Sequence, residues 1–374
     1  MEFGVPKEVR DGETRVGLTP AGVFSLVRAG HTVYIEQNAG TGAGFDNDEY
    51  ERAGAQIVYS AEEAYGRAET VVKVARPTAK EHALFRSGQT IFSFLYLTVS
   101  SPDLLHAFAE NQITAIAYEM IQENDGRLPV LLPTSEVAGR LAPIIAGRLL
   151  MGDRGGRGIL LNGIPGVPPA VVAIIGAGVA GVNAARAFLG LNAQVIVLDR
   201  DLRQLHYVDE LFNGSVTTMI SNQYNLKRAV TFADVLVGCV QVPGKRAPIL
   251  VSREMVREMR PGSVIIDLAI INGGCIETSR PTTLHDQTFV AEGIIHHCVP
   301  NVTASVARTA SHALTHAALP CLKAIGAQGL SNVVSNHSTL ARGVNLYQGK
   351  IAHPRIAAAL GREIEVELLA GEKS

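Results

Sequence analysis

Aromatic residues are scarce in this sequence. It has no tryptophan, and aromatic residues make up only 5% of its 374 residues. Because proteins that bind single-stranded nucleic acid stack the bases on aromatic side chains, this scarcity argues against that function. Neither sign of charge is in clear excess, since the formal net charge is −2 and no block of basic residues occurs. Nothing therefore indicates binding to nucleic acid or to an anionic membrane surface.

Cysteines and long apolar runs are few as well. The four cysteines are Cys239, Cys275, Cys298 and Cys321. They lack the C-x-x-C spacing of metal sites and are too few for a disulfide framework, which favours buried thiols in a reducing compartment and no metal. The longest apolar stretch, 167–175, is interrupted by prolines and is too short for a membrane span. The first residues show no apolar signal core, so we expect a cytoplasmic protein.

The composition is that of a chain with a large buried core. Hydrophobic residues make up 47% and charged residues 18%. The length exceeds the roughly 250–300 residues at which single cores stop growing, so two domains are expected. In the first third, short apolar runs alternate with helix-like segments, which is typical of an α/β unit with a largely parallel sheet. The predicted strands are His31–Glu36, Ala55–Tyr59, Thr70–Val74, Thr90–Leu95 and Thr114–Tyr118, and the predicted helices are Pro20–Ala29 and Pro102–Glu110.

A second α/β pattern begins near Ala170, after a segment rich in glycine and proline. Its alternation of strands and helices predicts a doubly wound domain. A helix over 137–150, capped by Thr134 or Ser135, precedes it. After Asn301 the chain becomes helical again through Ser311–Ile325, and we expect this region to return to the first domain. The predicted strands are Val171–Ile175, Gln194–Leu198, Thr217–Ile220, Val235–Val240 and Ser263–Asp267, with helices over Val182–Gly190 and Leu202–Phe212.

A glycine fingerprint follows the first strand of this second pattern, at Gly176-Ala177-Gly178-Val179-Ala180-Gly181. The three glycines are expected to make the tight turn, admit a pyrophosphate and let helix and strand pack closely. Asp199 ends the next strand about 20 residues later, where a carboxylate accepts ribose hydroxyls and repels a 2′-phosphate. NAD is therefore favoured over NADP, although Arg200 and Arg203 leave NADP open. The alternative is a structural glycine turn without a ligand.

Several segments together resemble the alanine dehydrogenase and pyridine nucleotide transhydrogenase family, and alanine dehydrogenases in particular. They are Gly4-Val5-Pro6-Lys7-Glu8, Glu13-Thr14-Arg15-Val16, Leu18-Thr19-Pro20, Val71-Val72-Lys73-Val74, Ser135-Glu136-Val137-Ala138-Gly139-Arg140, Gly273-Gly274-Cys275 and Arg280-Pro281-Thr282-Thr283. The resemblance implies two Rossmann-like doubly wound domains with a cleft between them. Residues 1–135 and 305–374 would form a discontinuous substrate domain, and 136–304 the NAD-binding domain. It also implies a dehydrogenase acting on CH–NH2 or CH–NH groups, and commonly a homo-hexamer.

The resemblance also implies site residues. Arg15 and Lys73 match the family's binders of the substrate carboxylate, a role that suits a forked guanidinium and a point-charge ammonium. The alternatives are a surface ion pair for Arg15 and an exposed strand end for Lys73. Ser135 matches a pyrophosphate contact, or is simply a helix cap. Gly176, Gly178, Val179, Gly181 and Asp199 belong to the glycine loop and the ribose site, Ser221 and Gln204 to the adenosine side, and Val240, Gln241, Arg280 and Asn301 to the nicotinamide side.

Two positions depart from the family. Tyr96 stands where the family has a catalytic histidine, and Ile271 stands where it has an active-site aspartate. Tyrosine has a reference pKa of about 10, so Tyr96 could donate a hydrogen bond, act as an acid if its pKa were lowered, or merely pack. Ile271 replaces a negative charge by an apolar surface, which makes the site less suited to the ammonium of alanine.

The two departures leave three functions open. The first is an NAD-dependent oxidoreductase acting on an amino acid, 2-oxo acid or imine other than alanine. The second is a genuine alanine dehydrogenase that uses Tyr96 or water as its proton carrier. The third is an NAD-binding relative without catalysis. His296 and His297 are possible replacement proton carriers, while His312 and His316 share a helix face without an evident third metal ligand.

Overall fold

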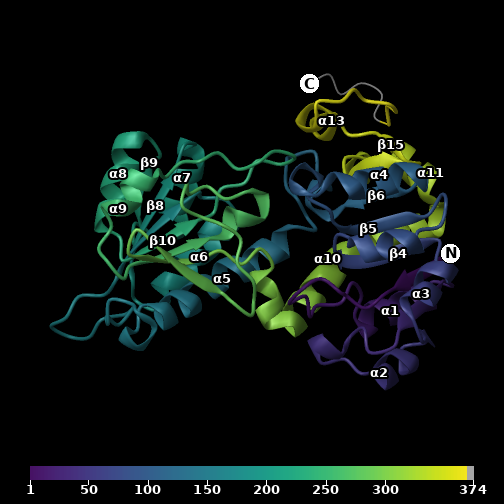
Figure 1. Cartoon of the computed structure of the whole chain (residues 1–374), viewed down its shortest axis with the longest axis horizontal. Helices are drawn as coiled ribbons and strands as arrows, with labels where there is room; N and C mark the ends of the chain where they lie inside the picture. The colour runs from purple at the N-terminus through teal and green to yellow at the C-terminus, as the bar shows by residue number, and fades with distance from the viewer. Residues whose placement is uncertain (369–374) are drawn as a thin grey trace. The chain divides into compact units, whose positions relative to one another are not determined.

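The computed structural model describes residues 1–368, which fall into two compact units (Figure 1). The first unit contains Met1–Thr134, Pro243–Lys245 and the described chain from Ala304 onward. The second contains Ser135–Val242 and Arg246–Thr303. Each unit is built on one sheet of mostly parallel strands with helices between them, so the predicted α/β class is confirmed.

The first unit has an eight-stranded sheet in the order β15-β14-β6-β5-β4-β1-β2-β3. The strands β1 to β6 are parallel, and β14 and β15 add an antiparallel edge. C-terminal residues thus complete the sheet that the N-terminal residues begin. The bounds are β1 Glu2–Val5, β2 Thr32–Glu36, β3 Gln56–Val58, β4 Thr70–Ala75, β5 Thr90–Phe94, β6 Thr114–Ala117, β14 Val344–Tyr347 and β15 Lys350–Ile351.

Helices of the first unit begin at residues suited to that position. Proline occupies the first position of α1 (Pro20–Arg28) and of α4 (Pro102–Glu110), where its missing N–H costs nothing. Asp46 and Glu49 form a capping box at the start of α2. The other helices are α2 Asn47–Arg52, α3 Ala61–Arg67, α10 Ala307–Gln328, α11 Leu330–Asn336, α12 Ser338–Ala341 and α13 Pro354–Leu360, with 3₁₀ turns at Thr41–Ala43, Ala79–Leu84, Leu97–Val99 and Tyr118–Met120.

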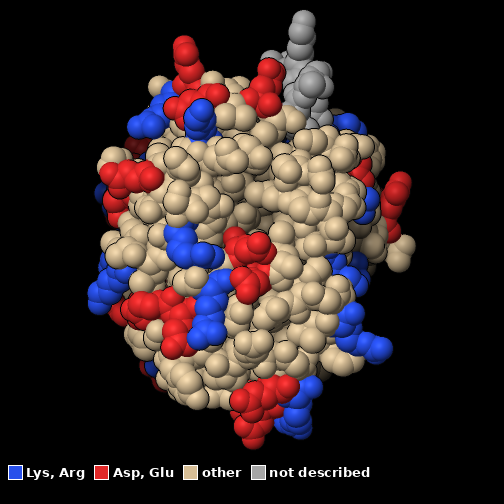
Figure 2. Space-filling model, turned by 90° about the vertical axis from the view of Figure 1, so that its right-hand side faces the viewer, with Lys and Arg blue, Asp and Glu red and all other residues tan. Residues whose placement is uncertain are grey.

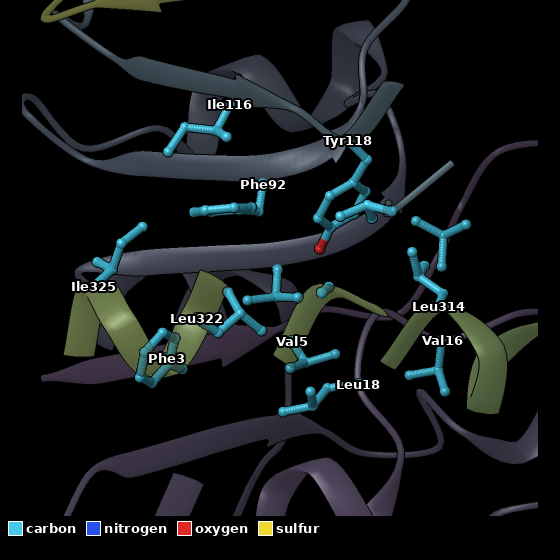
Figure 3. Close-up of a cluster of buried hydrophobic side chains, with 14 of the residues drawn as sticks. Phe3, Val5, Val16, Leu18, Phe92, Ile116, Tyr118, Leu314, Leu322 and Ile325 are labelled. Atoms are coloured by element: carbon cyan, nitrogen blue, oxygen red, sulfur yellow. The ribbon is translucent and has the colours of Figure 1, made fainter. Parts of the chain in front are cut away.

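The long helix α10 packs into the main core of the first unit. Its residues Leu314, Leu322 and Ile325 belong to the same buried cluster as Phe3 and Val5 of β1 (Figure 3). Burial of such side chains contributes roughly 1.5–3 kcal/mol each. This packing explains why a helix from the end of the chain groups with strands from its beginning.

The second unit has a seven-stranded sheet in the order β12-β13-β11-β10-β7-β8-β9. All its neighbouring strands are parallel except the edge strand β12. Apolar clusters cover both faces, which explains the uninterrupted apolar run of β7. The strands are β7 Val171–Ile175, β8 Gln194–Asp199, β9 Thr217–Ile220, β10 Val235–Gly238, β11 Val264–Asp267, β12 Thr288–Ala291 and β13 Ile294–His297. The helices are α5 Leu132–Leu149, α6 Val179–Leu189, α7 Leu202–Leu211, α8 Gln223–Phe232 and α9 Arg253–Arg257, with 3₁₀ turns at Gly152–Arg154, Leu268–Asn272 and Val302–Val306.

Some element boundaries differ from those that the sequence predicts. Helix α5 begins at Leu132, so Thr134 and Ser135 lie in its first turn and the expected cap at either residue is wrong. Proline is tolerated in a first helical turn, which lets the helix start before Pro133. The predicted strand Val235–Val240 ends at Gly238. The strand β1 was not predicted, because Glu2 and Gly4 interrupt its apolar pattern and Pro6 follows it directly. Among the described residues, no helix combines the length and apolarity needed to cross a membrane.

Acidic and basic side chains lie interspersed over the face of the molecule seen in Figure 2. A mixed surface of this kind does not produce the extended positive field that steers nucleic acid onto a protein. On this face the structure agrees with the small net charge of the sequence.

Candidate active site

Both sheets contain a point at which the strand order reverses. In the first unit, β2 and β3 lie on one side of β1, while β4, β5 and β6 lie on the other. In the second unit, β8 and β9 lie on one side of β7, while β10 and β11 lie on the other. In open α/β sheets, ligands bind beyond the carboxyl ends of the strands at such a reversal. The predicted site residues Arg15 and Lys73 come from the chain after β1 and from β4, and the glycine loop follows β7.

Lys73 is buried between two carboxylates at the reversal point of the first sheet. Its side chain is only 1% exposed, so the alternative of an exposed strand end is wrong. The Nζ atom lies 3.0 Å from Oε2 of Glu8 and 2.8 Å from Oε1 of Glu81. Burial would lower the pKa of Lys73, but attraction to Glu8 and Glu81 outweighs it and raises the pKa. Lys73 is therefore a charged ammonium held in a fixed position.

Arg15 is equally fixed, by a forked ion pair with Glu13. Its Nε donates to Oε1 of Glu13 at 2.7 Å, and its Nη2 donates to Oε2 at 2.6 Å. The Arg15 side chain is 7% exposed, so the alternative of a surface ion pair is wrong. Burial would raise the pKa of Glu13, but Arg15 outweighs it and keeps that pKa below its usual value. Both predicted carboxylate binders are therefore held in place by carboxylates of the protein.

Tyr96 follows β5 in a left-handed backbone conformation, with φ 45° and ψ 50°. Its N–H donates to Oε1 of Glu119 at 2.6 Å, and its ring stacks on Phe94 with centroids 6.0 Å apart. Burial raises the pKa of Tyr96 and Glu119 adds to the rise, while Arg15 and Arg76 oppose it. This is the opposite of the lowered pKa that acid catalysis would need. The phenol stays neutral and can serve as a hydrogen-bond donor.

Glu119 is a site residue that the sequence analysis missed. It lies in the 3₁₀ turn after β6, is only 5% exposed, and accepts the N–H of Leu95 at 3.2 Å as well as that of Tyr96. Burial raises the pKa of Glu119 to about 7, although these main-chain hydrogen bonds lower it. The signal in the sequence was a single carboxylate within the apolar run 115–121. A carboxylate there is costly to bury unless it is hydrogen-bonded.

The glycine loop of the second unit has the geometry that its sequence predicts. Gly176 has φ +103°, and a Cβ there would lie 2.7 Å from the carbonyl oxygen of Cys239. A Cβ on Gly181 would collide with the carbonyl oxygen of Gly176, which shows how closely helix and loop approach. A Cβ on Gly178 would meet nothing within 4 Å. The loop therefore leaves open space at Gly178, before the N-terminus of α6, and fits a pyrophosphate.

Asp199 ends β8 and connects directly to this loop. Its Oδ2 accepts the N–H of Ala177 at 2.7 Å, and its Oδ1 accepts the N–H of Asp201 at 2.9 Å. A carboxylate offers about four acceptor sites, so capacity remains for two ribose hydroxyls. Arg203, which left NADP open, pairs with Asp201 at 2.9 Å. These contacts fit NAD, whose ribose carries no 2′-phosphate.

The remaining predicted cofactor residues surround the ends of the same parallel strands. The N–H of Ser221 donates to the carbonyl oxygen of Asp199 at 2.8 Å, while Val240 and Gln241 follow β10. Arg280 stacks over the ring of Phe289 at 4.2 Å. The Nδ2 atom of Asn301 is buried and has no hydrogen-bond partner among the described residues, as expected for a group that binds a polar ligand. Their roles in binding remain predictions, as do those of Ser135 and Gln204.

Ile271 lies half-buried in the 3₁₀ turn Leu268–Asn272, which follows β11. The hydrogen bonds of the nearby Asp267 do not support a role in place of the missing aspartate. Its Oδ1 accepts the N–H of Ala269 at 3.0 Å and its Oδ2 accepts that of Cys275 at 3.1 Å, so it organises the turn. Burial raises the pKa of Asp267.

The candidate histidines have other contacts. Nδ1 of His296 lies 2.9 Å from the carbonyl oxygen of Ile294, and Nε2 lies 2.7 Å from Oγ1 of Thr278. Both ring nitrogens are therefore engaged inside the second unit, which does not support a role in proton transfer. His312 packs edge-on against Phe45. Within residues 1–368, no three His, Cys, Asp or Glu side chains are grouped to hold a metal ion.

Comparisons with known proteins agree with these features. Residues 4–138 match the model of the N-terminal domain of the alanine dehydrogenase/PNT family, and residues 142–354 match that of its C-terminal domain. An alanine dehydrogenase of Methanococcus maripaludis is 45% identical, covering 96% of each chain. That of Bacillus subtilis is 43% identical, over 97% of this chain and 96% of the relative.

Solved structures show the same likeness. An L-alanine dehydrogenase superposes with a TM-score of 0.90 at 43% identity, covering 96% of this chain and 99% of that one. A transhydrogenase from Sinorhizobium meliloti superposes with a TM-score of 0.79 at 26% identity, covering 95% and 99% of the two chains.

Proposed function

Because this chain belongs to the family of alanine dehydrogenases and pyridine nucleotide transhydrogenases, we propose that it catalyses the reversible oxidative deamination of a small 2-amino acid. The names of its relatives support alanine as the first candidate substrate. The observation that carries the proposal is the buried pair of cations, Arg15 and Lys73, at the reversal point of the first sheet.

The chain is an NAD-dependent oxidoreductase acting on a CH–NH2 donor, as its family membership shows. When bound, NAD would supply the hydride acceptor for the oxidation. The open space at Gly178 would hold the pyrophosphate, and Asp199 would accept hydrogen bonds from the ribose hydroxyls. The unpartnered Nδ2 of Asn301 is suited to a polar group of the nicotinamide half.

The reaction balances with one water molecule. A 2-amino acid, NAD and water give a 2-oxo acid, ammonium, NADH and one proton. Arg15 and Lys73 would bind the substrate carboxylate. This contact would hold the α-carbon in position, while the carboxylate keeps its charge throughout the reaction. The neutral phenol of Tyr96 would donate a hydrogen bond to the oxygen that becomes the carbonyl. Because its pKa is raised, solvent water rather than the phenol would carry the released proton in this proposal.

A second candidate is an amino acid or imine other than alanine. It is favoured by Tyr96 and Ile271, which together replace a titrating imidazole and a carboxylate by a neutral phenol and an apolar surface. A substrate whose far end is larger than a methyl group would suit this surface better than alanine. A secondary amine is one form of such a substrate.

A panel assay tests both candidates. Purified full-length chain is given NAD with single amino acids, or NADH with 2-oxo acids plus ammonia or amines, and NADH absorbance is followed. Turnover of alanine at ordinary enzyme rates, on the order of 1–10³ s⁻¹, would support the first candidate and exclude the second. Turnover of another substrate of the panel, without turnover of alanine, would support the second candidate and exclude the first. Tight NADH binding without any turnover would show that catalysis has been lost.

Two further expectations belong to this proposal. We propose a homo-oligomer, in line with the family resemblance, and sedimentation of the purified chain tests it. We also propose a cytoplasmic location, which is supported by four cysteines that form no disulfide.

A further inference from the structure

Two more arginines, Arg10 and Arg76, lie in the first unit, and the charges of Glu119 and Tyr96 act on Arg76. Nη2 of Arg10 donates to the main-chain carbonyl of Arg76 at 3.3 Å, so the two residues are in contact. The Nε atom of Arg10 is buried and has no hydrogen-bond partner within residues 1–368. A buried donor without a partner is uncommon in a native protein and calls for an explanation.

Arg76 follows Lys73 by three residues and is half-buried. Neither an ion pair nor a hydrogen bond of its guanidinium occurs in the described part of the chain. Burial lowers the pKa of Arg76, and the positive charge of Arg10 lowers it further, while Glu119 and Tyr96 oppose the shift. Two guanidinium groups thus repel each other without an intervening carboxylate.

The neighbouring charges contrast with this pair. Glu13 neutralises Arg15, and Glu8 and Glu81 surround Lys73. The charge of Glu119 acts on Arg76, but within residues 1–368 its oxygens accept the N–H groups of Leu95 and Tyr96 and form no ion pair with Arg76. With a pKa of about 7, Glu119 also carries only part of a negative charge at neutral pH. Among the described residues, therefore, no carboxylate forms an ion pair with Arg10 or Arg76.

A single guanidinium presents its N–H donors in a fork that matches a planar carboxylate. We propose that Arg76, supported by Arg10, binds a second carboxylate of the substrate. The chain would then prefer an amino acid with two carboxylates to alanine, which is one form of the second candidate above. Acidic amino acids and N-carboxyalkyl amino acids belong to this class, and the corresponding products are 2-oxo dicarboxylates. This inference rests on the proposed function, because it assigns Arg15 and Lys73 to the first carboxylate.

The position of Arg76 supports this division of roles. The charges of Arg76 and Arg15 both lower the pKa of Tyr96, so both act on the phenol. A molecule held at Arg15 and Lys73 by its α-carboxylate could therefore extend past Tyr96 toward Arg76. The apolar Ile271 does not enter this argument, because it belongs to the second unit.

Titration calorimetry on the full-length chain with saturating NADH tests the proposal. The probes are pyruvate, with one carboxylate, and oxaloacetate and 2-oxoglutarate, with two. We expect at least one dicarboxylate to bind about tenfold or more tightly than pyruvate, as one charge-assisted fork would provide. Arg76→Met should remove this preference and leave the affinity for pyruvate unchanged. The control Lys80→Met changes an exposed cation four residues after Arg76 in the sequence. This variant should still bind the dicarboxylate more tightly than pyruvate.

Two results would overturn the inference. One is pyruvate binding as tightly as both dicarboxylates. The other is an Arg76→Met variant that weakens pyruvate and the dicarboxylates alike. If Arg76→Met does not fold, Arg10→Gln and Arg76→Lys replace it, and each should reduce the preference severalfold because the fork is incomplete.

The titration also separates this inference from the proposed function. A chain that reduces pyruvate with ammonia but shows no preference dependent on Arg76 disproves the inference alone. A chain that binds dicarboxylates through Arg76 but oxidises no amino acid disproves the proposed function alone.

Discussion

The main-chain N–H of Tyr96 donates a 2.6 Å hydrogen bond to Oε1 of Glu119, and this contact holds Tyr96 in a left-handed conformation. That conformation costs a residue other than glycine about 1–2 kcal/mol. Glu119 offsets the cost, because its other oxygen accepts the neighbouring N–H of Leu95. A buried carboxylate thus sets the direction of the side chain that replaces the histidine expected from the family resemblance.

The first prediction concerns the pH dependence of stability at Glu119. Its folded pKa of about 7 lies above the model value of 4.5, so the folded chain retains a proton that the unfolded chain releases. The stability from this group is fully present below about pH 4.5 and is lost as pH rises through about 7. The loss is on the order of 3 kcal/mol. Urea denaturation at pH 5 and pH 8 measures it.

The matched variant for this prediction is Glu119→Gln, which cannot titrate. Other groups also titrate in this range, since burial lowers the pKa of His297 and of His353 to about 4 and gives a contribution of opposite sign. The difference between wild type and Glu119→Gln removes these shared contributions. An identical pH dependence in both proteins would show that Glu119 is ionised throughout.

The second prediction separates the glycines of the fingerprint. Gly178→Ala places its methyl group in open space at φ −74°, so the free energy of unfolding should change by less than about 0.5 kcal/mol. Its affinity for NADH should fall about tenfold or more, because the methyl group fills the space for the pyrophosphate. Gly181→Ala should instead destabilise the chain by about 1–3 kcal/mol, since its Cβ meets the carbonyl oxygen of Gly176. Unchanged NADH affinity in a folded Gly178→Ala variant would contradict this account.

The third prediction concerns cofactor choice at Asp199. Asp199→Asn keeps one acceptor but loses the charge that repels a 2′-phosphate. We expect weaker NADH binding by about tenfold and a smaller preference for NADH over NADPH, both measured by fluorescence titration. The control Asp201→Asn changes a half-buried carboxylate that pairs with Arg203. A larger effect in the control than in Asp199→Asn would place the ribose elsewhere.

The fourth prediction concerns the buried charge of Lys73. Lys73→Met leaves Glu8 and Glu81 facing each other without a cation. Breaking a buried pair in this way destabilises a protein by about 3–5 kcal/mol. The loss should shrink at low pH, where the two carboxylates take up protons, and urea denaturation at pH 5 and pH 8 tests this. Lys323→Met, at an exposed lysine, should change stability little, and an equal loss in both variants would refute the prediction.

The fifth prediction concerns the two departures from the family. The double variant Tyr96→His and Ile271→Asp should oxidise alanine at least about tenfold faster than the wild type, since an imidazole titrates near neutral pH and a carboxylate suits an ammonium. Histidine tolerates the left-handed backbone, and Glu119 would still hold the turn. Tyr96→Phe serves as the control, since it removes only the hydroxyl. No gain in the double variant would mean that these positions do not handle protons.

Much of the fold could be predicted because its signals are local. The apolar run 171–175 and the glycine loop identify β7 and the start of α6 without any knowledge of tertiary contacts. The strand β1 was missed because Glu2 and Gly4 interrupt its apolar pattern, although it lies between β4 and β2 in the first sheet. The edge strands β14 and β15 are short as well, with four and two residues.

The partners within the site could not be predicted in the same way. Lys73 meets Glu8 and Glu81 only after the chain folds, and spacing along the sequence does not reveal that pairing. The same holds for Glu119, which reaches Tyr96 across 23 positions of sequence. Side-chain identities therefore predicted the chemistry of the site, whereas its electrostatics required the structure.

The most direct test of the account is the effect of Arg15→Lys on reduction of the best 2-oxo acid with ammonia and NADH. Lysine keeps the charge but loses the two parallel hydrogen bonds to a carboxylate. The account predicts that kcat/KM falls about tenfold to a hundredfold while the Kd for NADH changes less than about twofold. An unchanged kcat/KM, or an equal loss of NADH affinity, would contradict the claim that Arg15 binds the substrate carboxylate of an NAD-dependent dehydrogenase.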